Sequence, residues 1–429
     1  MFMKTRIALL FGAACLICGS AYAQEGDARE LLKEDITRSA NLHHNYEAPG
    51  QIYDTPAPKG YTPFYISHYG RHGSRYHWGA RPLDDVMSVL DSLDVHGLLT
   101  SEGQSVRSDI KILQDAHQGQ VGYLTHKGAA QHQAIAHRMY SRYPQVFRQK
   151  NRPEVYCVAT AVQRCIQSMA NFCVQLTREN PDLEFTMDAG ERFTEYLSNS
   201  RGVPRTTERS RFIRDSVLNA SLDPSRIMTT WVTDSTAALE YFPHRDSRKF
   251  IYSVFSAGAI GQCLDIEDPF IYRHYTFDEV YGMWRYSDTD YYNSMGATVE
   301  NGRSKDLVGQ RILRDILDKA DAALAGGDHA ADLRFGHDTG LSPLMCLLRV
   351  QEIGEAHHLA EAPDVWYGFQ RMPMASNLQI VFYHNRKGDV LVKFLFNEKE
   401  TFIPSLTAVS GPYYKWTDVR NYFVKLLES

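Results

Sequence analysis

Cysteine is scarce in this chain of 429 residues, which contains seven. Five of them lie beyond the apolar N-terminal segment: Cys157, Cys165, Cys173, Cys263 and Cys346. An odd number at such wide spacing excludes a small scaffold held together by disulfide bonds. Cys165 and Cys173 follow the apolar stripe of a predicted helix, so we expect both to be small buried hydrophobic residues.

Long apolar runs are missing beyond the N-terminus, where no segment approaches the roughly 20 apolar residues that a membrane-spanning helix requires. The N-terminus itself carries Lys4 and Arg6, then an apolar run over residues 7–18, and then small residues that end in an Ala-x-Ala pattern at Ala23. We therefore predict a secretory signal peptide over residues 1–23 and no membrane span in the mature protein.

This signal peptide predicts export, with cleavage before Gln24 and a periplasmic or secreted location. The alternative is a lipoprotein signal, with Cys15 or Cys18 as the lipid anchor and the protein at the outer surface. It is less well supported, because neither cysteine follows a clear stretch of small residues.

An excess of positive charge is also lacking. From residue 24 onward, 44 Lys and Arg stand against 51 Asp and Glu, a net charge of −7. This balance argues against nucleic acid as a general partner, since nucleic-acid binding requires a basic footprint. The His-Glu-x-x-His zinc pattern is absent, and we interpret His43-His44 and His357-His358 as surface pairs. No segment indicates an obligate protein partner.

The most informative segment that is present is Ile66-Ser-His-Tyr-Gly-Arg-His-Gly-Ser-Arg75, which places His72 between Arg71 and Arg75. A neutral imidazole can attack phosphorus, and guanidinium groups match the geometry of phosphate oxygens. The preceding apolar residues predict a strand, which would present the three side chains at the carboxyl edge of a sheet, where open α/β folds bind ligands. The alternative is a solvated basic turn.

A second strand-to-helix unit follows. Thr125 can cap a helix that Pro144 ends, and residues 155–159 are rich in β-forming residues. Thr160 then opens a predicted helix with a regular apolar stripe. Arg164 lies in its first turn, off that stripe, so we expect it to point into the same crevice as His72. The alternative is an ordinary surface arginine.

A third unit begins with a predicted strand over residues 331–336, after which come His337 and Asp338. Ser342 and Pro343 then predict the start of a helix, with a capping serine and a proline at the first position. Asp338 is either a turn residue or a proton donor beside a phosphate-binding His337. Spacing alone does not decide between these interpretations.

Together, four segments resemble the ordered motif set of the histidine acid phosphatases, branch 2 of the histidine phosphatase superfamily: Arg71-His-Gly-Ser-Arg75, Leu124-Thr-x-x-Gly128, Thr160-x-x-x-Arg164 and His337-Asp338. The resemblance covers roughly residues 60–180 and 330–400. Residues 63–76 are most similar to the multiple inositol polyphosphate phosphatases, although His77 stands where that group commonly has proline.

The resemblance implies an α/β fold with a mainly parallel sheet flanked by helices, similar to phosphoglycerate mutase, and a mainly helical cap inserted into it. We expect residues 24–184 and 326–429 to form the two parts of the core and residues 185–325 to form the cap. Late in the chain, residues 378–384 and 389–396 predict a hairpin at one edge of the sheet.

The resemblance also implies roles for the site residues. His72 would be the nucleophile and form a phosphohistidine, while Asp338 would protonate the leaving oxygen. The phosphate would be held by Arg71, Arg75, Arg164 and His337. Surrounding cations disfavour a protonated imidazole, so His72 can remain neutral. With positive charge supplied by guanidinium groups, we expect neither a metal nor a cofactor.

These expectations favour an exported phosphomonoesterase that acts on inositol polyphosphates such as phytate. A broad-specificity acid phosphatase or sugar-phosphate phosphatase is the closest alternative, and a phosphate-ligand binding protein without turnover is another. The predicted cap contains a run of arginines that is either a solvated loop or a set of contacts for extra substrate phosphates: Arg201, Arg205, Arg209, Arg211 and Arg214.

Overall fold

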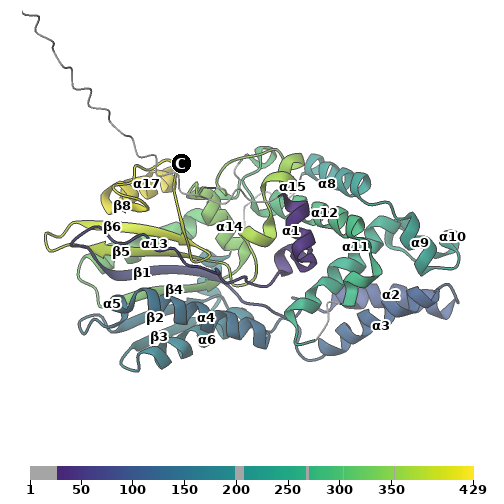
Figure 1. Ribbon diagram of the computed structural model, residues 1–429, viewed down its shortest axis with the longest axis horizontal. Coiled ribbons are helices and arrows are strands. Elements are labelled where there is room, and N and C mark those ends of the chain that lie inside the picture. The colour runs from purple at the N-terminus through teal and green to yellow at the C-terminus, as the bar shows by residue number, and fades with distance from the viewer. Residues whose placement is uncertain (1–26, 199–206, 267–269, 303, 352) are drawn as a thin grey trace, which may run out of the picture.

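The computed structural model describes residues 27–198, 207–266, 270–302, 304–351 and 353–429 (Figure 1). The predicted signal peptide, residues 1–23, lies outside the described residues, and so do Arg201 and Arg205. Within these ranges, no helix has both the length and the apolar composition that crossing a membrane requires.

One sheet of eight strands organises the layered part of the fold, in the order β3-β2-β4-β1-β5-β6-β7, with β8 also paired to β6. The strands are β1 Thr62–Arg71, β2 Glu154–Ala159, β3 Glu184–Ala189, β4 His329–Gly336, β5 Asn377–His384, β6 Val390–Phe396, β7 Lys399–Thr401 and β8 Tyr413–Lys415. The first four pair in parallel, which confirms the predicted α/β class.

The other side of the sheet is antiparallel. β5 pairs with β1 and with β6 in antiparallel register, and the short connection between β5 and β6 permits no other arrangement. The predicted hairpin is therefore confirmed as a pair of strands. It does not lie at the edge, because β7 and β8 extend the sheet by pairing with β6.

Helices cover both faces of this sheet (Figure 1). One face carries α4 His126–Arg142, α5 Pro144–Phe147 and α6 Gln163–Glu179, and the other carries α7 Glu191–Leu197, α13 Asp306–Leu324, α14 Asp338–Leu347 and α17 Trp416–Glu428. Phe172 of α6 is buried in the first layer, and Leu313 and Leu344 are buried in the second. Both sheet faces are thus apolar, as expected for parallel strands with helices on either side.

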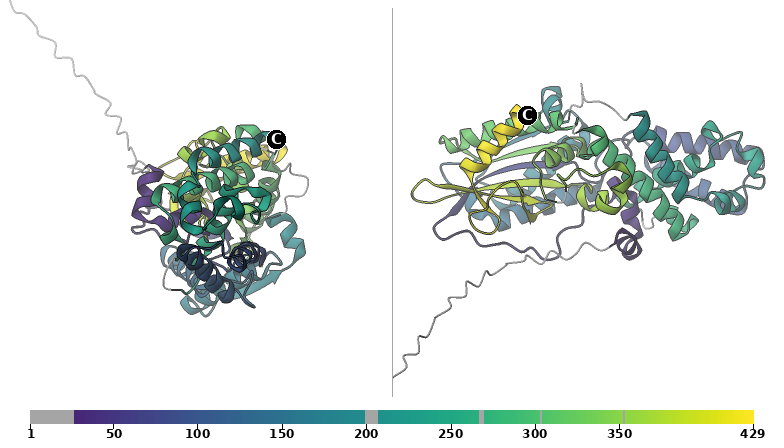
Figure 2. Two further views of the ribbon diagram at one scale, coloured as in Figure 1. Left: turned by 90° about the vertical axis from the view of Figure 1, so that its right-hand side faces the viewer. Right: turned by 90° about the horizontal axis from the view of Figure 1, so that it is seen from above.

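A helical part adjoins one end of the layered part (Figure 2, right). It contains α2 Arg81–Val95, α3 Ser101–Ala116, α8 Glu208–Ser221, α9 Ser225–Trp231, α10 Ser235–Ala238, α11 Ser247–Gly258 and α12 Phe277–Met295. Leu90, Ile110 and Val254 belong to its separate apolar core. The predicted helical cap is therefore present.

The helices that form the helical part are not the ones expected from the predicted cap range, 185–325. The helices α2 and α3 precede residue 185, yet they share the apolar core of the helical part. The helix α13 lies before residue 325, yet it packs on α14 and the sheet. Hydrophobic periodicity identifies a helix but not the neighbour that covers its apolar face. The predicted core ranges, 24–184 and 326–429, stay predictions.

Two helix starts also differ from expectation. α6 begins at Gln163 rather than Thr160, because the Thr160 amide still donates to the Phe335 carbonyl (3.1 Å) as an extension of the sheet. α14 begins at Asp338 rather than Ser342, and Pro343 lies inside it. α4 was predicted correctly, since Thr125 accepts a hydrogen bond from the Gly128 amide and caps the helix.

The remaining short elements lie at the N-terminus, in the helical part and before β5. They are α1 Ala28–Glu34, η1 Ile36–His43, η2 Pro243–Arg245, η3 Ala259–Cys263, η4 Phe270–His274, η5 Val299–Asn301, η6 Leu359–Glu361, α15 Ala362–Val365 and α16 Gly368–Arg371. η1 contacts α12, α16 and η3, so the N-terminal segment bridges the helical part and the segment that enters β5.

Candidate active site

His72 follows the last residue of β1, and its backbone is held from both sides. Its amide donates to the Gly336 carbonyl at the end of β4 (3.0 Å), and its carbonyl accepts from the Ala375 amide (2.9 Å). Ala375 has φ 58°, a left-handed conformation that is unusual for a residue with a side chain and that recurs at functional sites. The position of the imidazole is thus fixed by three segments that are far apart in the sequence.

The imidazole of His72 has a defined tautomer. Nδ1 lies 2.9 Å from the Gly73 carbonyl oxygen, which can only accept, so Nδ1 carries a hydrogen. Burial lowers the pKa of His72 well below its usual value, and the charges of Arg164, Arg71 and Arg75 lower it further. The ring is therefore neutral, and Nε2 keeps its lone pair. A neutral imidazole with an unprotonated Nε2 is the form that can attack phosphorus.

Two glycines let the loop after His72 pack against the start of α4. A Cβ on Gly73 would lie 2.6 Å from the Gly128 carbonyl oxygen, and one on Gly128 would lie 2.2 Å from the Ser74 carbonyl oxygen. The Thr125 hydroxyl and amide both donate to the Ser74 carbonyl (3.0 and 2.9 Å). The motif Leu124-Thr-x-x-Gly128 is thus explained by the structure: Thr125 and Gly128 fix the loop that carries His72.

Three guanidinium groups surround this loop. Arg71 is 1% exposed and donates to the Met372 carbonyl, and Arg75 is 7% exposed and donates to the Tyr76 carbonyl. Arg164 donates to Nδ1 of His337 (3.4 Å). Among the described residues, the Nε atoms of all three are buried without a hydrogen-bond partner. Burial and the charges of Arg164 and Arg71 lower the pKa of Arg75 to about 9.

These cations repel one another in a buried site, so the arrangement stabilises a bound anion. Their planar donors suit the oxygens of a phosphate group. The carboxylate of Asp338 lies beside the cluster, with its Oδ1 3.7 Å from Nε of Arg71. Because a single carboxylate cannot balance three guanidinium groups, an additional anion would be bound favourably.

His337 caps α14 and faces His72. The ring centroids of the two histidines are 5.5 Å apart. Arg164 can only donate, so Nδ1 of His337 accepts, and Nε2 carries the hydrogen that points to the Thr160 hydroxyl (3.2 Å). Burial and the charge of Arg164 lower the pKa of His337 to about 3. His337 is therefore a neutral donor and acceptor beside the cation cluster.

Asp338 is the first residue of α14, where the helix dipole favours a carboxylate. Burial raises its pKa, but the charge of Arg71, the neighbouring His337 ring and the charge of Arg75 outweigh burial, so the pKa lies below its usual value. The structure thus gathers all six predicted site residues in one place: Arg71, His72, Arg75, Arg164, His337 and Asp338. Their chemical roles stay hypotheses.

Some contributors to the site carried no signal in the sequence. The Tyr69 hydroxyl donates to the Leu197 carbonyl (2.7 Å) and accepts from the His337 amide (3.3 Å). A Cβ on Gly340 would lie 2.3 Å from this hydroxyl, so Tyr69 fixes the start of α14. Tyr291 of α12 also reaches the site, and burial together with the charge of Asp338 raises its pKa. In the sequence, both read as ordinary aromatic core residues.

His77 ties the site loop to the helical part. Its Nε2 donates to the Ala257 carbonyl of α11 (2.9 Å), and its amide donates to Nε2 of His117 on α3's C-terminal side (3.0 Å). Proline, which is common at this position in the multiple inositol polyphosphate phosphatases, could make neither bond, because it has no imidazole and no backbone N–H. This departure is therefore accommodated by specific contacts.

The histidine pair at residues 43 and 44 does not lie at the surface as expected. His44 is 3% exposed, and its Nδ1 and Nε2 contact Gln262 (3.2 Å) and Glu47 (2.7 Å). His43 is half-buried and lies within electrostatic range of Arg75. The interpretation as a surface pair was wrong, because the short segment after η1 is covered by η3 and by the residues before β5.

The arginine run of the predicted cap is only partly described. Arg209 and Arg211 are exposed on α8. Arg214 forms ion pairs with Asp290 (2.8 Å) and Asp215 (3.1 Å) and lies over the Tyr286 ring. Arg214 is thus part of the packing of α8 on α12. Extra phosphate contacts by the other arginines of the run stay a prediction.

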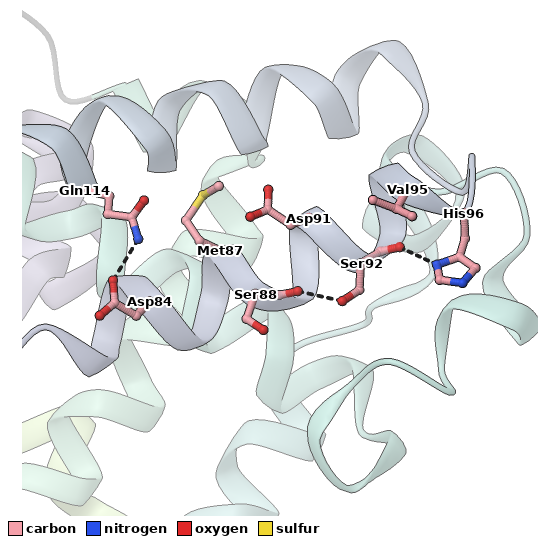
Figure 3. A pocket seen from close by; sticks show the side chains of 8 residues that line it. All are labelled: Asp84, Met87, Ser88, Asp91, Ser92, Val95, His96 and Gln114. Atoms are coloured by element: carbon pink, nitrogen blue, oxygen red, sulfur yellow. Dashed lines mark hydrogen bonds between the residues drawn. The ribbon is translucent and has the colours of Figure 1, made fainter.

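Two further features lie outside this site. Figure 3 shows a groove on α2 and α3 that contains none of the six predicted residues and is lined by Asp84, Met87, Ser88, Asp91, Ser92, Val95, His96 and Gln114. Its carboxylates disfavour a phosphate.

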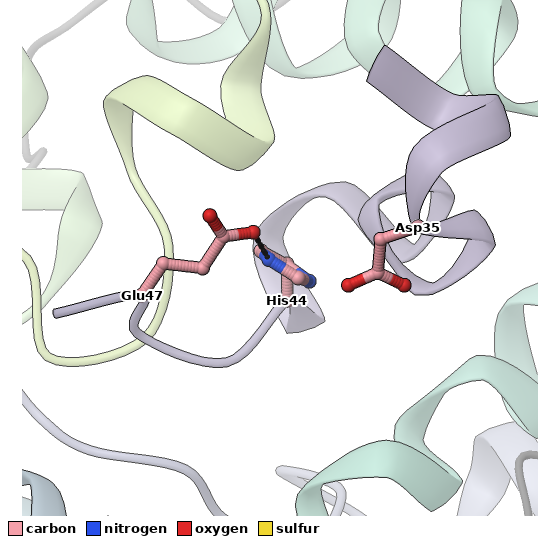
Figure 4. Close-up of side chains that lie close together, drawn as sticks. All are labelled: Asp35, His44 and Glu47. Carbon is pink, nitrogen blue, oxygen red and sulfur yellow. Dashed lines mark hydrogen bonds and ion pairs between the residues drawn. The ribbon is translucent and has the colours of Figure 1, made fainter. Parts of the chain in front are cut away.

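Figure 4 shows Asp35, His44 and Glu47, whose donor atoms lie close enough to ligate one ion. Protein contacts account for them, since Glu47 pairs with His44 and Arg38 and Asp35 caps η1.

The chain was compared with known proteins. The family model for the histidine phosphatase superfamily (branch 2) matches residues 70–196. No curated protein matches significantly.

Among solved structures, the multiple inositol polyphosphate phosphatase of Bifidobacterium longum in complex with inositol hexasulfate has a TM-score of 0.72 at 18% identity, over 89% of this chain and 97% of that one. The phytase of D. castellii has a TM-score of 0.67 at 15% identity, over 96% and 90%. The Hafnia alvei phytase in its apo form has a TM-score of 0.55 at 12% identity, over 87% and 98%. These similarities establish the fold.

Proposed function

We propose that the chain is a phosphatase of the histidine phosphatase superfamily, branch 2, and that it removes phosphate from inositol polyphosphates such as phytate through a phosphohistidine intermediate. The observation that carries the mechanism is the hydrogen bond from Nδ1 of His72 to the Gly73 carbonyl, which leaves the Nε2 lone pair among three guanidinium groups. The substrate class is supported by the similarity to a structure bound to inositol hexasulfate.

In the first step, Nε2 of His72 attacks phosphorus while the bond between phosphorus and the ester oxygen breaks. Arg71, Arg75, Arg164 and His337 hold the three remaining phosphoryl oxygens and stabilise their charge in the transition state. Asp338 gives a proton to the departing oxygen. A bound phosphate offsets the charges of Arg71 and Arg75, which raises the pKa of Asp338 and lets it carry that proton.

In the second step, water attacks the phosphohistidine. Asp338, now ionised, takes a proton from the water, and the bond between Nε2 and phosphorus breaks. Inorganic phosphate leaves, and His72 returns to its neutral form with the hydrogen on Nδ1. The bond to Gly73 keeps this tautomer through both steps, so the imidazole needs no reorientation.

The direct test is phosphate release from phytate between about pH 3 and pH 8, with EDTA present. We expect the wild type to release phosphate in EDTA and His72→Ala to release none above background. His96→Ala, which changes an exposed histidine on the groove of Figure 3, is the matched control and keeps full activity. Undiminished release by His72→Ala would contradict the proposed nucleophile.

One observation favours a broader phosphatase as the second candidate. In the arginine run that is either a solvated loop or a set of contacts for extra substrate phosphates, Arg214 is already paired with Asp290 and Asp215. Turnover of phytate, glucose 1-phosphate and p-nitrophenyl phosphate separates the two candidates. Comparable or higher kcat/KM on phytate supports the inositol polyphosphate assignment, and a strong preference for the small esters supports the broader one.

Export is part of the proposal and rests on the sequence of residues 1–23. Expression of the full chain in a bacterial host, followed by fractionation and mass measurement, tests it. We expect a periplasmic or secreted product that begins at Gln24. A product that retains residues 1–23 in the cytoplasm would contradict it.

A further inference from the structure

The end of η1 and the residues that follow it are held beside the active-site loop by two backbone carbonyls and by one side chain. The His43 carbonyl accepts from Sγ of Cys263 (3.1 Å), and the His44 carbonyl accepts from the Met374 amide (2.9 Å). Asn45 Oδ1 accepts from the Ser74 hydroxyl (2.6 Å). None of these contacts uses the His43 side chain, so its imidazole is placed without being needed to hold the segment.

The imidazole of His43 lies beside His77, two residues after Arg75, and within electrostatic range of Arg75 and Arg71. Its ring centroid lies 5.6 Å from that of His77, in an edge-to-face arrangement. Burial lowers its pKa well below the usual value, and the charges of Arg75, His77 and Arg71 contribute in that order. His43 is therefore neutral, with one N–H to donate and one lone pair. No hydrogen bond of its ring nitrogens is found among the described residues.

The neighbouring histidine is used differently. His44 is 3% exposed, and both of its ring nitrogens have protein partners in Gln262 and Glu47. His44 thus serves packing, whereas His43 is half-buried next to two arginines that are almost completely buried. His43 is thus a neighbour of the phosphate-binding arginines that is more exposed than they are. A side chain in that position is suited to contact the part of a substrate beyond the scissile phosphate.

We propose that His43 determines substrate specificity by donating an N–H hydrogen bond to an oxygen of a second phosphate on the substrate, next to the phosphate that is removed. This inference rests on the proposed function, because it requires a substrate with more than one phosphate. The scissile phosphate itself already has Arg71, Arg75, Arg164 and His337. A neutral imidazole adds a directional donor there without adding charge to a cluster that already repels itself.

The test compares two substrates in His43→Ala, in His43→Gln, which keeps an N–H donor, and in the control His96→Ala. For His43→Ala we expect kcat/KM on phytate to fall about tenfold, mainly through KM, as for the loss of one hydrogen bond to a charged oxygen. On p-nitrophenyl phosphate, which has no second phosphate, kcat/KM stays within about twofold. His43→Gln recovers most of the loss, and His96→Ala matches the wild type on both.

Three results would overturn the proposal. An equal loss on both substrates would place His43 at the scissile phosphate or in the support of Arg75. No loss on either substrate would show that His43 makes no useful contact. A loss on phytate that His43→Gln does not recover at all would argue against donation of an N–H. A general folding defect would also lower activity on both substrates, so it cannot imitate the expected loss on phytate alone, and the thermal unfolding midpoint of His43→Ala distinguishes it from a role at the scissile phosphate.

Failure of the proposed function itself would look different. The wild type would then hydrolyse p-nitrophenyl phosphate but not phytate. In that case inhibition of p-nitrophenyl phosphate hydrolysis by inositol hexasulfate still tests His43, since this ligand carries several anionic groups. An inhibition constant about tenfold higher in His43→Ala supports the contact, and an unchanged one contradicts it.

Discussion

Two pairs of buried histidines flank the carboxyl end of β1, and they differ in their surroundings. His72 and His337 lie among guanidinium groups and have defined hydrogen-bond partners on their rings. His68 on β1 and His132 on α4 lie against Phe172 and Phe335, and among the described residues none of their ring nitrogens has a hydrogen-bond partner of normal geometry.

The pKa values are lowered in both pairs, and burial is the largest cause each time. Burial, together with the neighbouring His132 and Arg334, lowers the pKa of His68 to about 3. Burial lowers the pKa of His132 to about 3, although the backbone carbonyl of Arg71 opposes it. A low pKa therefore does not identify a catalytic histidine. The difference lies in what faces the ring: cations with unused donors in one pair, and aromatic rings in the other.

The largest expected difference in activity is between two variants that each remove one imidazole, one from each pair. In His72→Ala, phosphate release falls about 10⁴-fold or more, which corresponds to roughly 5.5 kcal/mol of transition-state stabilisation. In His132→Leu, which changes a histidine on the aromatic side, kcat stays within about threefold. Steady-state kinetics on p-nitrophenyl phosphate measures both. A comparable loss in the two variants would remove the distinction between the pairs.

The second largest expected effect is on kcat and comes from replacing Asp338, the proposed proton donor. Asp338→Asn lowers kcat by about 10²- to 10⁴-fold on an alkyl phosphate, because the departing alkoxide needs a proton. On p-nitrophenyl phosphate the loss is about tenfold or less, since p-nitrophenolate leaves without protonation. The ratio of the two losses separates loss of a proton donor from general damage to the site. Equal losses on both esters would assign Asp338 to phosphate binding.

The dependence of stability on pH tests the second pair, His68 and His132, which pack against aromatic rings. His68 and His132 are neutral when folded but bind protons near pH 6.5 when unfolded, so the unfolded state gains protons as the pH falls. Stability is therefore lost progressively from about pH 6.5 down to about pH 3, by roughly 3 kcal/mol per residue at pH 4. We expect the free energy of unfolding, measured in urea at pH 7 and at pH 4, to fall less between the two pH values for the double variant His68→Leu/His132→Leu than for the wild type.

At pH 7 the same double variant gives the smallest effect. Its free energy of unfolding stays within about 1 kcal/mol of the wild type, because removing buried nitrogens without good partners offsets the lost packing. A destabilisation of several kcal/mol at pH 7 would show that these two rings make polar contacts that stabilise the fold.

The sequence predicted the site better than the fold around it. His72, Arg164 and Asp338 each follow a strand end, and parallel strands bring such ends to one edge, so short motifs sufficed to place them. The helix starts at Thr160 and Ser342 were wrong for local reasons. Thr160 continues a sheet hydrogen bond, and Pro343 is tolerated inside α14.

Other features depend on contacts between distant segments, which no local pattern encodes. α2 and α3 precede β2 in the chain but share a core with α11, more than 130 residues later. In the sequence, His43 and His44 are interpreted as a surface pair, and only the approach of η3 and Met374 shows that they are covered. Tyr69 reads as a strand residue, and only the approach of Gly340 reveals its contact with the loop of His337.

The central claim is that His72 becomes covalently phosphorylated. The most direct measurement is the mass of the enzyme after rapid mixing with p-nitrophenyl phosphate and quenching in alkaline denaturant, which preserves phosphohistidine. Asp338→Asn is included because slower attack by water should increase the amount of intermediate. We predict one added phosphoryl group, located on the peptide that contains His72 and absent from His72→Ala. Turnover by Asp338→Asn and wild type without any phosphorylated peptide, or with the group on another residue, would contradict the account.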